Sequence, residues 1–198
     1  MVARDGERTK EAILGAAEDL FARQGFESTS MQQIGEAAGF ARSTPAYFFR
    51  SKEALYEVVL ERVVARAGKE LASARNGTDG DSPEEAVAAY VAALVDLHSH
   101  DQNLVRLIQR ESLREGTRMA EFLGRLADDA VARFAPIARQ AGVSPERLVL
   151  DAFALAWYPF AHAHALPSAL GIKSREPAFL EEQKTHLVDL VRALTRPG

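Results

Sequence analysis

A short segment around residue 45 gathers side chains that can hydrogen-bond to nucleic acid. The stretch from Ala37 to Lys52 contains three cations and no acid, although residues 1–62 as a whole carry 8 Lys and Arg against 10 Asp and Glu. The acidic residues of this region therefore lie outside the segment from Ala37 to Lys52, whose charged residues are all cations. Its hydrogen-bonding groups are of the kind that contact phosphates and base edges, namely Arg42, Ser43, Thr44 and Tyr47.

The elements that would position these groups are short helices. We expect a first helix over residues 8–24, a second from Met31 to Ala38 capped by Thr29 or Ser30, and a third that begins at Ser43 or Thr44. Two short helices joined by a turn at Gly39 and packed on a first helix form a helix-turn-helix, whose second element enters the major groove. The alternative is a solvated turn between two core helices, which periodicity alone favours.

Beyond this region the apolar residues keep a helical period, and no alternating strand pattern is evident. Ser51 is expected to cap a long fourth helix, and Ser82 with Glu85 forms a capping box for the fifth. An eighth helix contains Pro159 and stops before Pro167, and a ninth opens at Glu176-Pro177. The sequence predicts an all-α fold of about nine helices, in which the long fourth helix joins the three-helix unit to a C-terminal bundle.

Composition excludes several classes of protein. The chain has 198 residues, no cysteine and a net charge of −4, so disulfide frameworks, cysteine-ligated metal centres and thiol nucleophiles are ruled out, and we expect no cofactor. The net charge of the whole chain does not indicate a protein that binds nucleic acid. The prediction of nucleic-acid binding therefore depends on the local group of cations between Ala37 and Lys52. No uncharged apolar stretch reaches bilayer length, and the first ten residues are polar. A soluble, cytoplasmic protein without membrane association is expected.

Residues 8–60 resemble the DNA-binding domain of the TetR family of transcriptional regulators. The resemblance rests on several anchors in order at fixed spacing: Ile13-Leu14, Ala16-Ala17, Leu20-Phe21, Gly25-Phe26, Thr29-Ser30, Ile34, Ala37-Ala38-Gly39-Phe40, Phe49 and Ser51-Lys52-Glu53-Ala54-Leu55. It implies a DNA-binding domain over residues 1–50 and a domain over residues 51–198 that binds a small-molecule effector and dimerises through the last two long helices.

The same resemblance implies roles for individual residues. Thr29 or Ser30 would anchor a phosphate at the second helix, and Lys52 would hold another at the fourth. The groove would be faced by Arg42, Thr44, Tyr47 and Phe48, with Ser43 beside them, while Phe49 fills the core.

Three positions depart from the commonest family pattern. Ala41 replaces a serine cap, and Pro45-Ala46 replaces Leu-Tyr. Because proline is accommodated only in the first turn, we expect a short reading helix with Pro45 near its start. The groove tyrosine is displaced by one position to Tyr47, a rotation of about 100°.

The histidines form two His-x-His pairs, His98 with His100 and His162 with His164. Residues two apart on a helix point roughly 200° apart, so we expect neither pair to chelate a metal. One histidine of each pair is expected to line a cavity or cap a helix, and the other to meet solvent or a partner subunit.

An effector pocket is expected between helices of the C-terminal bundle. One wall would contain residues at helical spacing, with His98 nearby: Phe153, Trp157, Phe160 and His164. The opposing wall would contain Arg106, Gln109, Arg110 and Phe122. The alternatives are ordinary core packing for the first set and a surface ion pair for the arginines.

Small and apolar residues on the last two long helices could pack two subunits together, or pack only within one. They are Ala152, Ala156, Ala163, Leu187, Val191 and Leu194. A two-fold dimer places its reading helices about 34–36 Å apart, which predicts an inverted-repeat operator in double-stranded DNA.

The sequence therefore favours a homodimeric, ligand-responsive regulator, and a repressor rather than an activator. Two other classes stay open. A helical protein-binding adaptor would show no sequence-selective DNA binding. A helical enzyme is disfavoured because the chain has no Glu-x-x-His pair of the di-iron type, no Gly-rich phosphate loop and no Gly-x-Ser-x-Gly elbow.

Overall fold

The computed structural model describes residues 2–75, 82–113 and 117–194. Regular structure in these ranges is helical throughout, which confirms the all-α prediction. The helices are α1 (Val2–Gln24), α2 (Met31–Ala37), α3 (Thr44–Phe48), α4 (Lys52–Arg75), α5 (Pro83–His100), α6 (Gln102–Ser112), α7 (Thr117–Ala141), α8 (Pro145–Ala161), α9 (Leu166–Ala169) and α10 (Pro177–Leu194).

The short helices begin where local chemistry predicts. Ser30, not Thr29, caps α2: its hydroxyl accepts from the Gln33 amide at 3.2 Å, and the Gln33 side chain accepts from the Ser30 amide at 2.8 Å. The helix α3 is short, with Pro45 in its first turn as expected. Ser82 and Glu85 form the predicted capping box at α5. By contrast, α1 begins at Val2, six residues before the predicted start.

The chain folds into two compact units. The first comprises residues 1–64 and 106–122, and the second comprises residues 65–105 and 123–198. The division falls inside α4, α6 and α7, so three helices contribute residues to both units. The predicted boundary between residues 50 and 51 divides the chain by expected function, whereas the compact units are defined by contacts. The boundary between the functional domains stays a prediction.

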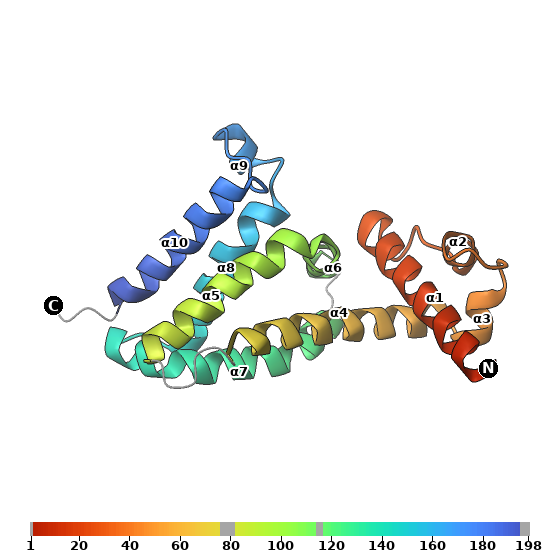
Figure 1. Cartoon of the computed structure of the whole chain (residues 1–198), viewed down its shortest axis with the longest axis horizontal. Coiled ribbons are helices and arrows are strands. Elements are labelled where there is room, and N and C mark those ends of the chain that lie inside the picture. The colour runs from red at the N-terminus through yellow and green to blue at the C-terminus, as the bar shows by residue number, and fades with distance from the viewer. Residues whose placement is uncertain (1, 76–81, 114–116, 195–198) are drawn as a thin grey trace. The chain divides into compact units, whose positions relative to one another are not determined.

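In the first unit, α1 packs against both α2 and α3 (Figure 1). An aromatic centre holds this unit together: the Tyr56 ring lies 4.8 Å from Phe21 and 4.9 Å from Phe26, measured between centroids. Phe49 and Ile34 are buried in the same unit, as the sequence predicts for Phe49. Burial of aromatic and aliphatic side chains is the main favourable contribution to the free energy that holds α3 against α1 and α2.

Gly35 lets α2 approach the start of α3 closely. A Cβ atom at this position would lie 2.8 Å from the carbonyl oxygen of Ala41 and 3.1 Å from Cδ of Pro45. Non-bonded carbon and oxygen atoms do not approach within 3.0 Å without a shift of the backbone. The angle between α2 and α3 therefore depends on glycine at position 35, which has no side chain.

In the second unit, α5 packs against both α8 and α10 (Figure 1). The structure has ten helices in its described ranges rather than about nine, because α8 ends at Ala161 and the single turn α9 follows it. Pro136 lies inside α7 without ending it. Within the described ranges, no helix has both the length and the apolar character that crossing a bilayer requires.

Candidate functional site

The helix α3 presents one polar face outward and one apolar face inward. Tyr47 is 86 % exposed, whereas Pro45 and Phe49 are buried. Arg42 and Ser43 are exposed, and Thr44 is half-buried. The Phe48 ring is also half-buried and packs edge-on against Tyr47, with 5.2 Å between centroids. The structure therefore brings the predicted groove-facing residues together on one accessible edge.

Two of the predicted cations have partners inside the protein. The Nε–H of Arg42 donates to Glu36, which lies on α2. The ammonium of Lys52 donates to the carbonyl oxygen of Phe26 at 2.9 Å and lies 4.2 Å from the centroid of the Phe26 ring. These contacts hold the charged ends of both side chains. An arginine keeps further N–H donors after one bond, and a lysine keeps two.

The neighbouring residues Thr29 and Ser30 lie in different environments. The Thr29 hydroxyl is buried and donates to the carbonyl oxygen of Gly25 at 2.7 Å, which closes the turn after α1. Ser30 is exposed at the start of α2. Of the two, Ser30 is the residue that DNA could reach.

Two family models match the chain in this region and in the C-terminal helices. Residues 13–59 match the model for bacterial regulatory proteins of the tetR family, and residues 83–191 match the tetracyclin repressor-like C-terminal domain. The second match alone spans more than half of the chain. The chain belongs to the TetR family. The TetR-family helix-turn-helix is a DNA-binding unit, and in this chain it comprises α2, α3 and their turn.

Relatives agree with this assignment. The transcriptional repressor NicS of Pseudomonas putida is 31 % identical over 137 residues, which cover 68 % of this chain and 64 % of NicS. The match thus spans less than two thirds of that relative's length. Among solved structures, a transcriptional regulator of Streptomyces coelicolor, SCO4942, shares the fold with a TM-score of 0.72 at 22 % identity, covering 96 % of this chain and 99 % of its own.

A second solved structure is the regulator FadR of Bacillus subtilis in complex with stearoyl-CoA. Its TM-score is 0.68 at 16 % identity, and the likeness covers 92 % of this chain and 97 % of FadR. At this identity the likeness concerns the fold.

In the second unit of this TetR-family protein, part of the predicted pocket wall forms a cluster of rings. His98 is 1 % exposed and meets Phe153 edge-on at 5.2 Å, and Phe153 stacks with Trp157 at 6.1 Å. Phe160 is buried and packs against Phe179. His164 lies beyond the end of α8 and is exposed.

The residues expected on the opposing wall belong to the first unit. Arg106 is exposed, and Gln109 and Phe122 are half-buried. Arg110 donates from Nε to the carbonyl oxygen of Ala22 at 3.0 Å and from Nη2 to that of Arg23. A cation at the carbonyl end of a helix offsets its unpaired acceptors, so Arg110 ties α6 to the end of α1.

Sequence reasoning missed a second tie in the first unit. The Tyr56 hydroxyl of α4 donates to the carboxylate of Glu111 on α6 at 2.7 Å, and both side chains are buried. Neither residue belongs to a recognisable motif. The signal that could have found this pair is a charged residue at a helix position otherwise expected to be apolar.

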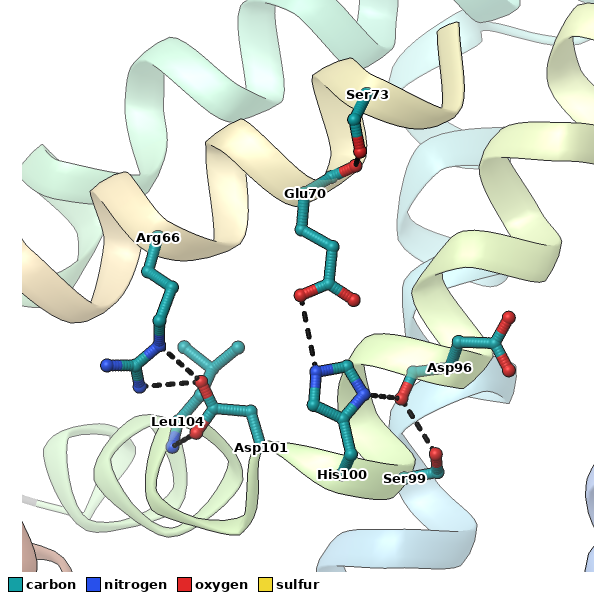
Figure 2. A network of polar contacts seen from close by, with 8 residues as sticks. All are labelled: Arg66, Glu70, Ser73, Asp96, Ser99, His100, Asp101 and Leu104. Atoms are coloured by element: carbon teal, nitrogen blue, oxygen red, sulfur yellow. Dashed lines mark hydrogen bonds and ion pairs between the residues drawn. The ribbon is translucent and has the colours of Figure 1, made fainter. Parts of the chain in front are cut away.

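A polar network joins α4 to the corner between α5 and α6 in the second unit (Figure 2). Arg66 donates to Oδ2 of Asp101 from Nε at 3.0 Å and from Nη2 at 2.6 Å. The other carboxylate oxygen accepts from the Leu104 amide at 2.9 Å, which caps α6. One carboxylate therefore fixes the start of α6 and its distance from α4.

The two histidines of the first His-x-His pair face opposite ways, as the helical period predicts. His98 points into the protein, whereas His100 is exposed and belongs to the network in Figure 2. Nδ1 of His100 lies 2.6 Å from the carbonyl oxygen of Asp96, and Nε2 lies 3.2 Å from the Glu70 carboxylate. His100 thus links α4 and α5, while His98 packs against the Phe153 ring.

Half of the residues expected at a dimer interface line an apolar cavity of about 210 Å³. These three are Ala152, Leu187 and Val191. Leu155 and Leu190 line the same cavity and are 44 % and 41 % exposed. The remaining expected residues differ: Ala156 is buried within the protomer, Ala163 is half-buried, and the Leu194 side chain lies outside the described residues.

Burial gives His98 a pH-dependent effect on stability. Burial lowers the pKa of His98 from 6.5 to about 4, against the smaller opposing effects of a hydrogen bond to the Ala156 carbonyl and of the Asp101 charge. Between these two values the unfolded chain binds the proton and the folded chain does not. Stability is therefore fully present above pH 6.5 and falls by about 3 kcal/mol as the pH drops toward 4.

Urea unfolding between pH 4 and 7 measures this effect. Carboxylates also titrate in that range, so the comparison is between variants: H98Q should lose this part of the pH dependence, and H186Q, which alters an exposed histidine, should keep it. Equal slopes in all three proteins would contradict the assignment to His98.

Proposed function

We propose that this protein is a homodimeric repressor that reads a palindromic operator with α3 and leaves it when a small-molecule effector binds. The outward edge of α3 carries the proposal, because Tyr47 is 86 % exposed beside Arg42 and Ser43 while Pro45 and Phe49 anchor the opposite face. A large exposed aromatic residue beside an arginine is suited to base and phosphate contacts. Ser30, Thr44, Phe48 and Lys52 would complete the contact with DNA.

Dimerisation would use the exposed apolar face of α8 and α10. Leu155 and Leu190 are exposed large apolar residues at the rim of the apolar cavity, with Ala152, Leu187 and Val191 inside it. An apolar surface of this kind on adjacent helices is typical of a subunit interface. The two-fold axis would bring two copies of α3 to successive major grooves.

Release would act through α6. Its start is capped by Asp101, and its end is tied to α1 by Arg110 and to α4 by Tyr56 and Glu111. Effector binding that shifts α6 would therefore move the helices that position α3. A difference of about 1–3 kcal/mol between two states weakens operator binding about 5- to 150-fold.

Fluorescence anisotropy with labelled DNA from upstream of the protein's own gene tests the function. We expect sequence-selective binding that weakens steeply as salt rises, because phosphate contacts release counterions. A scrambled duplex of the same length is the control. Equal binding to both duplexes, or none to either, would favour the protein-binding adaptor, and turnover of a metabolite by the purified protein would favour an enzyme.

A further inference from the structure

Three carboxylates around the corner between α5 and α6 each face a basic side chain. The pairs, at 2.6, 3.1 and 3.2 Å respectively, are Arg66 with Asp101, Lys184 with Asp96, and His100 with Glu70. Arginine and lysine stay charged at the pH values at which proteins work, whereas histidine changes its charge between pH 5 and 8. Of these three pairs, the contact of His100 with Glu70 is therefore the one that depends on pH.

Both ring nitrogens of His100 face oxygen atoms that can only accept a hydrogen bond. Nδ1 lies 2.6 Å from the carbonyl oxygen of Asp96, and Nε2 lies 3.2 Å from the Glu70 carboxylate (Figure 2). A neutral imidazole has one N–H and one lone pair, so it can donate to only one of the two oxygens, and its lone pair then faces the other. The imidazolium donates to both. The geometry around His100 therefore fits the charged ring.

The other charged groups around His100 keep their charge states between pH 6 and 8. Bonds to Glu181 and Asp96 raise the pKa of Lys184 from 10.5. Burial lowers the pKa of His98 to about 4, so this neighbouring histidine stays neutral. Arginine and carboxylate side chains ordinarily do not titrate in this interval. Those that face the corner, Arg175 through its bond to Gln102, are Arg66, Arg175, Asp96, Asp101 and Glu181.

The contact of His100 with Glu70 lies beside the contact that fixes the start of α6. Arg66 precedes Glu70 by one turn of α4, and Asp101 follows His100 directly. Asp101 also caps α6 by accepting from the Leu104 amide at 2.9 Å. Both α4 and α6 contribute residues to the two compact units. A contact that forms or breaks here therefore acts on α4 and on the start of α6 together.

We propose that His100 is a proton-dependent clasp between α4 and the end of α5. At about pH 6 the imidazolium donates to the Asp96 carbonyl oxygen and to the Glu70 carboxylate, and the clasp is closed. At about pH 8 the neutral ring keeps only one of these bonds, and the clasp is open.

The clasp itself does not depend on the proposed function, but its consequence for operator binding rests on it. Release in that proposal shifts α6 and the helices joined to it. A closed clasp holds α4 against the corner from which α6 starts, so it opposes this shift. Operator binding should therefore be stronger at the lower pH.

A double-mutant cycle in urea unfolding of the full-length protein measures the clasp at pH 6 and pH 8. H100A and E70A each remove one partner, and the double variant gives the coupling between them. Alanine is used at position 70 because a glutamine amide could donate to the neutral ring. We expect a coupling of about 3-fold in the unfolding equilibrium constant at pH 6 and none at pH 8, since a partly exposed ion pair contributes little even when charged.

The pair of Lys184 with Asp96 provides the matched control. The variants K184A and D96A remove a contact of 3.1 Å at the same corner, and D96A leaves in place the carbonyl oxygen that His100 faces. The coupling in this second cycle should be equal at the two pH values. Coupling between His100 and Glu70 that is also equal at both, or that is absent at pH 6, would overturn the clasp.

Anisotropy titration with a selectively bound duplex tests the consequence for DNA. The ratio of the affinity at pH 6 to that at pH 8 should be about 3-fold larger for the unaltered protein than for H100A. H186Q, which alters an exposed histidine elsewhere, should behave as the unaltered protein does. Equal ratios for the unaltered protein and H100A would contradict the role of the clasp in release. Absence of selective DNA binding at both pH values would instead contradict the proposed function, while the unfolding cycle still decides on the clasp.

Discussion

Replacing Arg42 and Tyr47 together with alanine should weaken operator binding about 100-fold or more and leave the folded state nearly unchanged. A well-placed base contact contributes about 1–3 kcal/mol, and two such contacts at separate positions add roughly. Tyr47 is 86 % exposed and Arg42 is exposed, so neither substitution opens the core. The exposed ion pair of Arg42 with Glu36 contributes little to stability.

Anisotropy titrations measure the loss of operator affinity, and thermal unfolding of the same samples measures whether stability changes with it. R23A is the matched control, because it removes one exposed cation from α1 of the same unit; it should reduce DNA affinity only slightly. If the double variant lost thermal stability in proportion to affinity, these two residues would be structural and α3 would not be the reading helix.

Replacing Gly35 with alanine should disrupt the helix-turn-helix. The added Cβ would lie 2.8 Å from the Ala41 carbonyl oxygen, so the turn before α3 must move. Overpacking of this kind costs up to about 3 kcal/mol, and this outweighs the gain of about 1 kcal/mol that alanine brings at a helical position such as Gly35. Because α3 moves with that turn, we expect a loss of DNA binding larger than the loss of stability alone explains.

G15A provides the control for the glycine substitution. Gly15 also lies in a helix of the first unit, and a Cβ there would have no heavy atom within 4 Å. Alanine at an unobstructed helical position stabilises by about 1 kcal/mol. Unfolding midpoints should therefore move in opposite directions for the two variants, and a G35A protein as stable and as active as the unaltered one would contradict the close approach.

The sequence predicted the parts of this fold that local chemistry determines. Serine caps, the capping box at Ser82 and the position of Pro45 in α3 depend on a few adjacent residues. The burial of Phe49 was implied by the family resemblance, not by a local pattern. The same resemblance implied which residues of α3 face outward, and the local group of cations without acids pointed to the same edge.

The C-terminal unit was harder to predict because its site depends on where helices end. The spacing of Phe153, Trp157, Phe160 and His164 places them on one face only if α8 continues to residue 164. The helix ends at Ala161, so His164 is exposed, and His162 instead contacts the Trp157 ring edge-on. The tie between Arg110 and α1 joins residues 87 and 88 positions apart, which no local pattern indicates.

The central claim is that two copies of α3 read neighbouring major grooves of one duplex. Once a selected inverted-repeat duplex is in hand, inserting five base pairs, about half a helical turn, between its half-sites turns them to opposite faces of the DNA. Anisotropy titration should give two protomers per original duplex and at least about 100-fold weaker binding to the duplex with the insertion. Equal affinity for both duplexes, or one protomer bound per duplex, would contradict the claim.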